Sequence, residues 1–275
     1  MEYIFGRRPV LEALQAGKRS IHKIWIVAGS HGVEDMVAMA RDRGVPTEFT
    51  RRDRLDRMVQ GHHQGVVAQA SAASYVELDD FLRSLGPLNP SSPAVSGGGS
   101  SQDPAWVPGQ RPPGMTTLVV ALDEIQDPHN IGAILRSAGF FGVAAAIVPR
   151  WRSAPVGETA ARVSSGAIEH VPLIRVRNLA ESINDLKDAG FEVVGADLEG
   201  GSLREHRPHP RTAIVFGSEG KGMRRLVRER CDKLLKVHAS RQAGPASGVA
   251  SLNVSAAAAI FLYEFCRNKV GSQPT

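Results

Sequence analysis

Three short segments of the sequence carry the side chains best suited to chemistry. In the first, residues 127–132, Pro128 ends a strand and Asn130 can cap the following helix, on which Arg136 lies within about two turns. A guanidinium at this place would stabilise an anion or an oxygen that develops negative charge. An ordinary strand-to-helix turn with a capping asparagine would explain the same residues.

The other two segments combine a turn with polar side chains. Residues 216–222 read F-G-S-E-G-K-G, and the glycines allow backbone amides to approach a ligand closely. The spacing fits neither a Walker phosphate loop nor G-x-G-x-x-G, so Glu219 either anchors a cationic or hydroxyl-bearing molecule or only fixes a tight turn. Residues 251–255 read S-L-N-V-S and enter an apolar helix, with Ser251 or Asn253 as the candidate N-cap. Taken alone, each segment also fits a purely structural role.

The elements that must position these segments alternate between strand and helix. Strands are predicted at 117–125, 144–149, 171–176, 191–197, 212–217 and 233–237, and helices at 130–142, 157–166, 179–190, 223–231 and 251–267. This alternation predicts a parallel sheet with helices on its faces, in which ligands gather at the carboxyl ends of the strands. The last helix is apolar nearly all the way round, so it should be buried in the domain or in a subunit interface.

A segment rich in proline, glycine and serine separates this domain from a smaller one. We expect residues 1–85 to form an N-terminal α/β domain, residues 86–116 a linker and residues 117–275 the larger domain. Within the first domain, helices are predicted at 10–14, 34–44 and 51–59, and strands at 21–27, 46–50 and 65–71. The adjacent His62 and His63 would point to opposite faces of an extended chain, which favours a turn with backbone hydrogen bonds over a metal site.

Composition narrows the class of protein. A chain of 275 residues with 42% hydrophobic and 5% aromatic residues is globular, and a net charge of +5 allows a polyanionic partner. Residues 221–241 hold eight basic residues against two acidic ones, which fits either a phosphate-binding face or a solvated helix. Without a membrane-length apolar stretch or a signal-peptide core, the protein is expected to stay in the cytoplasm, with no membrane partner. Cys231 and Cys266 suit neither disulfides nor zinc and should be small buried residues.

In their order along the chain, N-I-G-x-x-x-R, F-G-S-E-G-K-G and S-L-N-V-S resemble the three sequence motifs of the SpoU-type RNA 2'-O-ribose methyltransferases. The resemblance covers the whole larger domain. The N-terminal domain, with its His63-Gln64-Gly65-Val66 turn, is similar to the RNA-binding module of the ribosomal RNA guanosine methylases. The chain therefore most resembles the 23S ribosomal RNA guanosine-2'-O-methyltransferases.

This resemblance implies an α/β fold with a trefoil knot, a homodimer, S-adenosylmethionine as cofactor and ribosomal RNA as substrate. It assigns catalytic roles to Asn130, Arg136, Glu219, Ser251 and Asn253, and cofactor contacts to Phe216, Gly217, Ser218, Gly220, Val237 and Leu252. With such a site nearby, the basic residues Lys221, Arg224 and Arg225, together with Arg7 and Arg8, are expected to bind RNA, and no metal ion is expected. The segment 238–250 is longer than the family's usual form and lacks its Ile-Pro entry.

The expected reaction is in-line attack of a ribose 2'-hydroxyl on a sulfonium methyl, which requires two held substrates and stabilisation of negative charge on the 2'-oxygen. Because a guanidinium has a pKa above ~12, Arg136 is assigned first an electrostatic role and only second that of a proton acceptor. Two alternatives remain open: a transfer-RNA 2'-O-ribose methyltransferase, and a non-catalytic RNA-binding protein of the same fold.

Overall fold

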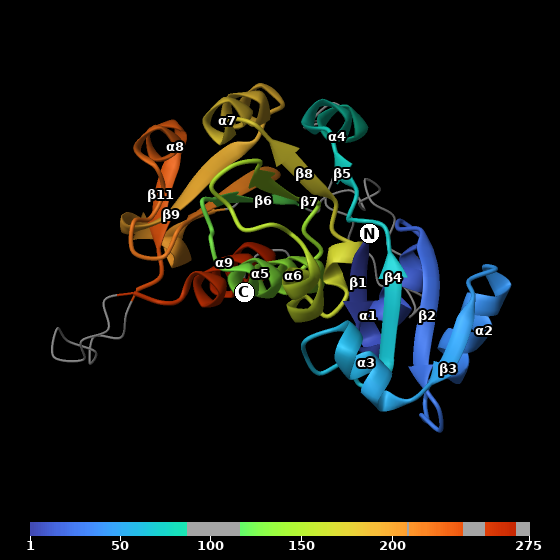
Figure 1. Ribbon diagram of the computed structural model, residues 1–275. Coiled ribbons are helices and arrows are strands. Elements are labelled where there is room, and N and C mark those ends of the chain that lie inside the picture. The colour runs from blue at the N-terminus through green and yellow to red at the C-terminus, as the bar shows by residue number, and fades with distance from the viewer. Residues whose placement is uncertain (87–115, 208, 239–250, 268–275) are drawn as a thin grey trace, which may run out of the picture. The chain divides into compact units, whose positions relative to one another are not determined.

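The computed structural model describes residues 1–86, 116–207, 209–238 and 251–267 (Figure 1). The chain divides into two compact units, each built from separate stretches of sequence. Unit 1 contains Met1–Ser74, Asp127–Gly139 and Ala154–His170, and unit 2 contains Tyr75–Gln126, Phe140–Ser153 and Val171–Thr275. The predicted linker, apart from its edges, and most of the segment 238–250 lie outside the described residues.

The N-terminal part of unit 1 is a four-stranded mixed sheet with three helices. Its elements are β1 (Glu2–Phe5), α1 (Arg7–Ala16), β2 (Ile21–Val27), α2 (Glu34–Asp42), β3 (Thr47–Thr50), α3 (Arg52–Met58) and β4 (Val66–Ala70). The strand order is β1-β4-β2-β3, in which β4 runs antiparallel to both neighbours and β2 pairs in parallel with β3. The small α/β domain predicted from sequence is therefore confirmed, and β1 is an addition to it.

Alternating side chains on β2 enter two separate hydrophobic clusters, as a strand of period two requires. Ile24 and Ile26 join Leu14 of α1 and Met36 of α2 on one face. Trp25 packs on the other face with residues such as Leu55 of α3. This double burial explains why the apolar run at 21–27 predicted the strand without error at either end.

The histidine turn before β4 is built by side-chain hydrogen bonds, as the sequence predicted. His63 is 1% exposed, its Nδ1 accepts the Gly65 backbone N–H at 2.9 Å, and its Nε2 lies 2.9 Å from Asp56 Oδ1. Within the described part of the chain, no three His, Cys, Asp or Glu side chains are grouped so that they could hold a metal ion.

The remaining elements of unit 1 come from the larger predicted domain. They are α6 (Glu158–Val163), the 3-10 helix η1 (Ala167–Glu169) and α5 (Pro128–Phe140), whose last residue belongs to unit 2. Helix α5 begins two residues earlier than the sequence predicted, because Pro128 suits a first helical turn and Asp127 can cap it.

Unit 2 is a seven-stranded sheet in which all neighbouring strands described here are parallel. Its strands are β5 (Tyr75–Val76), β6 (Thr117–Asp123), β7 (Ala145–Pro149), β8 (Leu173–Val176), β9 (Glu192–Ser202), β10 (Arg211–Gly217) and β11 (Lys233–Lys236). Their spatial order is β11-β9-β10-β6-β7-β8-β5. The parallel sheet predicted from alternating elements is thus confirmed.

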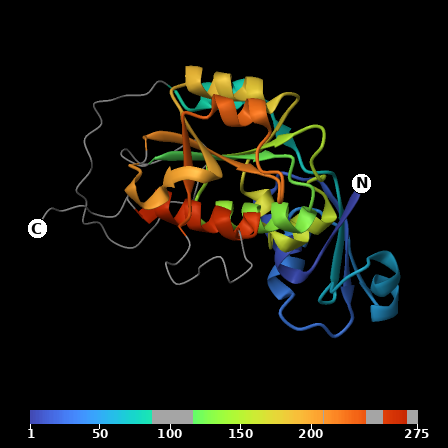
Figure 2. The ribbon, with the colours of Figure 1, turned by 90° about the vertical axis from the view of Figure 1, so that its left-hand side faces the viewer.

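Helices cover both faces of this sheet (Figures 1 and 2). On one face lie α4 (Leu78–Ser84), α7 (Leu179–Asp188) and α8 (Arg225–Arg230), which share a hydrophobic cluster with alternate strand residues such as Val119 and Val215. The 3-10 helix η2 (Leu203–Glu205) follows β9. On the opposite face, α9 (Val254–Arg267) packs against β10 through a T-shaped contact between Phe261 and Phe216, with ring centroids 5.6 Å apart.

Strand β5 and helix α4 belong to this sheet and its helical layer, although the composition of the sequence groups residues 1–85 as one domain. Tyr75 and Val76 pair with Leu173 and Ile174 of β8. A strand of two residues gives no periodic signal, so only its pairing places it in unit 2.

Helix α9 is buried on one side only. Val254, Ala258, Phe261, Leu262 and Phe265 are buried, whereas Ile260 is 36% and Tyr263 52% exposed. The predicted helix is present, and unit 2 accounts for the burial of one of its sides, whereas the expected subunit interface stays a prediction. No helix within the described ranges is long and apolar enough to cross a membrane.

Both cysteines are half-buried, and neither forms a disulfide bond within the described residues. Burial raises the pKa of the Cys231 thiol to about 12, so this side chain is protonated at neutral pH. Its Sγ lies 3.4 Å from the carbonyl oxygen of Val227 in α8, and it packs against the hydrophobic cluster as the sequence predicted.

Candidate active site

The sheet of unit 2 contains a topological switch point between β6 and β10. These neighbours are parallel and in register, so Asp123 at the end of β6 lies beside Gly217 at the end of β10. From β6 the chain continues to β7 on one side, and from β10 to β11 on the other. Ligands of open parallel sheets bind in the crevice outside the carboxyl ends of strands at such a point. The second predicted segment, residues 216–222, begins there.

Residues 217–222 form the tight turn that the glycines predicted. Ser218 and Gly222 exchange two backbone hydrogen bonds of 3.0 and 2.9 Å. A Cβ atom on Gly217 would lie 2.2 Å from backbone atoms of Gly222 and Met223, so no side chain fits at this position. Glu219 and Lys221 are exposed on the turn.

The structure brings Glu219 and Asn253 together, although 34 residues separate them in sequence. Asn253 Nδ2 donates a hydrogen bond to Glu219 Oε1, while Asn253 Oδ1 accepts the backbone N–H of Ser255 at 2.9 Å. The same side chain therefore caps α9 and joins its start to the turn after β10. Of the two candidate N-caps, Asn253 takes the role, and Ser251 is exposed before it.

An ion pair between a buried carboxylate and a half-buried arginine, which the sequence analysis did not find, fixes the far end of this turn. Asp123 is completely buried, and its carboxylate accepts the Arg224 backbone N–H at 2.7 Å and the Arg224 Nε–H at 2.8 Å. Arg224 Nη2 lies 2.7 Å from the same carboxylate, and its Nε lies 3.5 Å from Glu124. A carboxylate at the end of an otherwise apolar strand was the available signal.

Asn130 and Arg136 share helix α5 of unit 1. Asp127 Oδ1 accepts the His129 backbone N–H at 2.8 Å, so Asp127 takes the capping role that the sequence analysis gave to Asn130. Asn130 lies in the first turn and is 6% exposed. Arg136 is exposed, and among the described residues its guanidinium has no hydrogen-bond or ion-pair partner. It is thus available to an anion.

The remaining predicted residues differ in exposure and in partners. Phe216 is 1% exposed, Val237 directly after β11 is half-buried, and Leu252 before α9 is 48% exposed. Among the expected RNA-binding residues, Arg225 pairs with Glu229 at 3.0 Å. In unit 1, Arg7 Nε donates to the Gln64 carbonyl at 3.3 Å and Arg8 Nε lies 3.6 Å from Glu12 Oε1. Arg7, Arg8, Lys221 and Arg225 are exposed.

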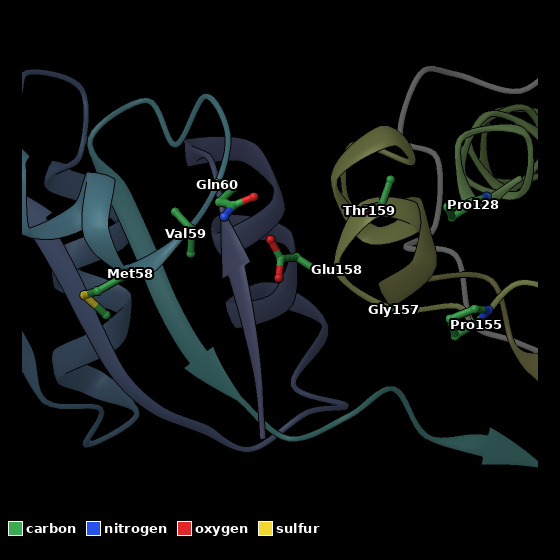
Figure 3. Close-up of a pocket in the computed structure, with 8 residues that line it drawn as sticks. All are labelled: Met58, Val59, Gln60, Pro128, Pro155, Gly157, Glu158 and Thr159. Carbon is green, nitrogen blue, oxygen red and sulfur yellow. The ribbon is translucent and has the colours of Figure 1, made fainter.

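A pocket in unit 1 contains none of the predicted site residues (Figure 3). Pro128 at the start of α5 and Pro155 before α6 contribute to its wall, and the carboxylate of Glu158 points away from α6 toward Gln60. The other lining residues are Met58, Val59, Gly157 and Thr159.

Comparison with known protein families shows which family the chain belongs to. The sequence model of the SpoU rRNA Methylase family matches residues 117–263, which is more than half of the chain. The chain belongs to the SpoU family. A second model, RNA 2'-O ribose methyltransferase substrate binding, matches residues 3–76 of this SpoU-family protein. The expected family is therefore confirmed, and with it the coarser function of an RNA methyltransferase.

Relatives resemble the SpoU-family chain over nearly its full length. YacO of Bacillus subtilis, assigned to the TrmH family of tRNA/rRNA methyltransferases, is 35% identical over 272 residues, covering 98% of this chain and 96% of YacO. A TrmH-family relative from Staphylococcus haemolyticus is 36% identical over 270 residues, covering 97% and 95% of the two chains.

Solved structures confirm the fold. The SpoU methyltransferase AviRb from Streptomyces viridochromogenes, crystallised with AdoMet, has a TM-score of 0.70 at 22% identity, with 98% of this chain and 91% of AviRb covered. An AdoMet-bound rRNA methyltransferase from Sinorhizobium meliloti has a TM-score of 0.72 at 21% identity, with 98% and 88% covered.

Proposed function

We propose that this SpoU-family protein transfers a methyl group from S-adenosylmethionine to the 2'-hydroxyl of a guanosine ribose in 23S ribosomal RNA. The observation that carries the proposal is the hydrogen bond from Asn253 to Glu219. It unites two of the three motif segments beside the switch point of the sheet, where ligands of such sheets bind.

The residues at the switch point suit S-adenosylmethionine. Backbone N–H groups of Glu219, Gly220 and Lys221 form no backbone hydrogen bond with the described chain, so they can bind a carboxylate or hydroxyl. Leu252 and Val237 add apolar surface for an adenine ring. The cofactor supplies a methyl group on a positively charged sulfur, and the AdoMet bound to AviRb supports its use here.

The side chains of the motifs orient the RNA and stabilise charge. Arg136 attracts negative charge that develops on the 2'-oxygen or an adjacent phosphate, because its exposed guanidinium pairs with none of the described side chains. Asn130, Ser251 and Asn253 place hydrogen-bond donors and acceptors around the ribose, and Glu219 holds Asn253 in position.

RNA binding is assigned to the N-terminal domain and to the turn after β10. The substrate-binding description of the matched family model supports the first assignment. Lys221, Arg225, Arg7 and Arg8 are exposed cations that can neutralise phosphates. Arg224 contributes chiefly by fixing the turn, because its guanidinium lies on Asp123 and Glu124. The protein acts in the cytoplasm, where its RNA is found.

The active form is a homodimer with a knotted larger domain. Ile260 and Tyr263 on α9 leave an apolar surface exposed after the other side of the helix is buried in unit 2. A second copy of the chain covers this surface.

A transfer-RNA target is the second candidate, since the relatives are assigned to a tRNA/rRNA methyltransferase family. Mapping 2'-O-methylation in both RNA classes from a strain lacking the protein separates the candidates. We expect one guanosine of 23S ribosomal RNA to lose its methyl group and to regain it with the parent chain. Loss at a transfer-RNA position would favour the alternative, and no loss in either class would favour a non-catalytic RNA-binding protein.

A further inference from the structure

An exposed tryptophan lies at the carboxyl edge of the unit 2 sheet. Trp151 is 62% exposed, whereas Trp25 is 7% exposed in the core of unit 1. Trp151 comes two residues after β7, and β7 pairs with β6, the strand that ends at Asp123 beside the switch point. One exposed aromatic residue is common on protein surfaces, so its meaning depends on what surrounds it.

The loop that carries Trp151 is held in place by three contacts. The Arg150 backbone N–H donates to the Val176 carbonyl at 2.7 Å, and the Ser153 hydroxyl donates to the Ile125 carbonyl at 3.0 Å. Arg152 Nη1 lies 3.5 Å from Glu124 Oε1. Residues 124–125 lead from β6 toward the first motif segment, so these contacts fix the tryptophan beside that entry.

The backbone is strained at both ends of the Arg152–Glu124 contact. Glu124 has φ 57° and Arg152 has φ 60°, a left-handed conformation that costs non-glycine residues roughly 1–2 kcal/mol each. Such strain persists where surrounding contacts enforce it, and it is concentrated at sites that bind ligands. The loop therefore has a fixed shape that packing of the sheet alone does not require.

The charges around Trp151 select the class of ligand. The guanidinium of Arg150 lies 5.0 Å from the centroid of the indole, and both Arg150 and Arg152 are exposed. An aromatic ring flanked in sequence by two exposed arginines suits an unpaired nucleobase, which stacks on the ring while its neighbouring phosphates meet the arginines. Tryptophan and arginine are also enriched at protein interfaces, so the position of the loop beside the proposed RNA site decides in favour of RNA.

We propose that Trp151 is an RNA-binding residue that stacks on an unpaired base next to the target ribose, with Arg150 and Arg152 on the flanking phosphates. This inference rests on the proposed function, because it assigns the base to the same RNA. It adds a binding residue that is absent from the three motif segments.

The kinetic test compares Trp151→Ala with the parent on unmodified ribosomal RNA. Loss of a stacked base should raise KM for RNA roughly 5- to 100-fold and leave KM for S-adenosylmethionine unchanged. Trp151→Phe should have a KM for RNA close to that of the parent, since phenylalanine keeps an aromatic face. Leu198→Ala is the matched control, because Leu198 is also 62% exposed in unit 2. It should leave both KM values unchanged.

A binding test that does not depend on turnover uses tryptophan fluorescence. In a Trp106→Phe background, Trp25 and Trp151 are the tryptophans that remain. A short single-stranded oligoribonucleotide should quench the emission of exposed Trp151, and the additional change Trp151→Phe should abolish the quenching. The same strand in a duplex, whose bases are already stacked, should quench less.

The two tests separate failure of this inference from failure of the proposed function. If the parent methylates RNA, but Trp151→Ala keeps its KM for RNA and the oligoribonucleotide causes no quenching, the stacking role is wrong. If quenching depends on Trp151 but the parent transfers no methyl group to any RNA, the proposed reaction is wrong and the binding role stands.

Discussion

Asp123 and Arg224 lie 101 residues apart in sequence and form an ion pair, with a buried carboxylate, at the switch point of the sheet. The carboxylate of Asp123 binds both the backbone N–H and the guanidinium of Arg224, so it fixes the chain where the turn after β10 ends. Gly217 at the start of the turn is fixed by its pairing with Asp123 in the sheet. Asp123 thus contacts both ends of the turn that carries Glu219, one through its backbone and the other through its side chain.

Asp123→Ala should destabilise the protein and weaken cofactor binding. It leaves a buried backbone donor and a half-buried guanidinium without their acceptor, which costs roughly 1–3 kcal/mol of the free energy of unfolding. Calorimetric titration should show weaker binding of S-adenosylmethionine. Asp123→Asn should lose less stability and less cofactor affinity, because an amide oxygen can still accept the Arg224 N–H.

Asp197→Ala provides the matched control. Arg228 Nε lies 2.7 Å from Asp197 Oδ2, so this change also removes a carboxylate that binds an arginine of unit 2. The hydrogen bonds of this carboxylate within the described residues go to Arg228 and Glu199, and not to the turn at 217–222. Cofactor affinity should be unchanged in this variant. If both alanine variants weakened the binding of S-adenosylmethionine equally, the specific role of Asp123 would be disproved.

Glu219→Ala should reduce methyl transfer more than Glu219→Gln. Glutamine keeps an oxygen that can accept the hydrogen bond from Asn253, whereas alanine removes this acceptor. Because Asn253 still caps α9, we expect the thermal midpoint of both variants to stay near that of the parent. Single-turnover rates at saturating cofactor check this order. Equal rates for the two variants would show that the hydrogen bond has no part in the reaction.

Most elements of the fold could be predicted from local patterns. Apolar runs bounded by glycine and proline predicted β2, β6, β7 and β10, because buried strands need such runs. The C-terminal half of β9 was not predicted, since the sequence after Asp197 contains Gly200 and Gly201. The structure shows that a Cβ on Gly200 would lie 2.4 Å from the Leu234 backbone, so close pairing with β11 keeps this segment in the sheet.

The sequence predicted the separate segments of the candidate site, but not the contacts between them. Turn chemistry indicated the tight bend around Glu219 and the cap at Asn253, both of which depend on neighbours in sequence. Their hydrogen bond and the Asp123–Arg224 pair join residues far apart along the chain, which no local pattern encodes. The prediction that the helix starts at Asn130 was wrong, because Asp127 caps the helix and Pro128 lies in its first turn.

Tyr263→Glu should dissociate the proposed homodimer. Tyr263 is 52% exposed and lies on the side of α9 that unit 2 does not cover. A carboxylate at this position would be buried in the dimer interface without a partner. Sedimentation should give a folded monomer with little methyl transfer. Phe49→Glu changes a residue of unit 1 that is 56% exposed, and it should sediment as the parent does. A fully active monomeric parent would contradict the dimer.

The stability of unit 2 should fall in mild acid because of His206. Burial lowers the pKa of His206, with Lys233 acting in the same direction and Glu192 opposing it. The unfolded chain therefore binds a proton that the folded chain excludes, so stability is lost as the pH falls below the unfolded pKa of ~6.5. Urea midpoints measured on both sides of that pH should show the decrease.

His206→Phe should flatten this pH dependence, since the ring of Phe265, 5.4 Å away, can pack against another aromatic side chain. The exposed His22 serves as the control, and His22→Gln should keep the parent's pH dependence. If His206→Phe lost as much stability in mild acid as the parent does, the pH dependence would come from other titratable groups.

The central claim is that the methyl group goes to a ribose 2'-oxygen with Arg136 stabilising the charge there. The most direct measurement incubates unmodified ribosomal RNA with methyl-labelled S-adenosylmethionine and hydrolyses the product in alkali, which cannot cleave the chain next to a 2'-O-methyl group. The parent should place its label in alkali-resistant dinucleotides. Arg136→Ala, with normal folding and cofactor affinity, should be slower by roughly 10²- to 10³-fold, and Arg136→Lys should restore little of the rate. Label in mononucleotides or bases, or a rate for Arg136→Ala within a few-fold of the parent, would contradict the account.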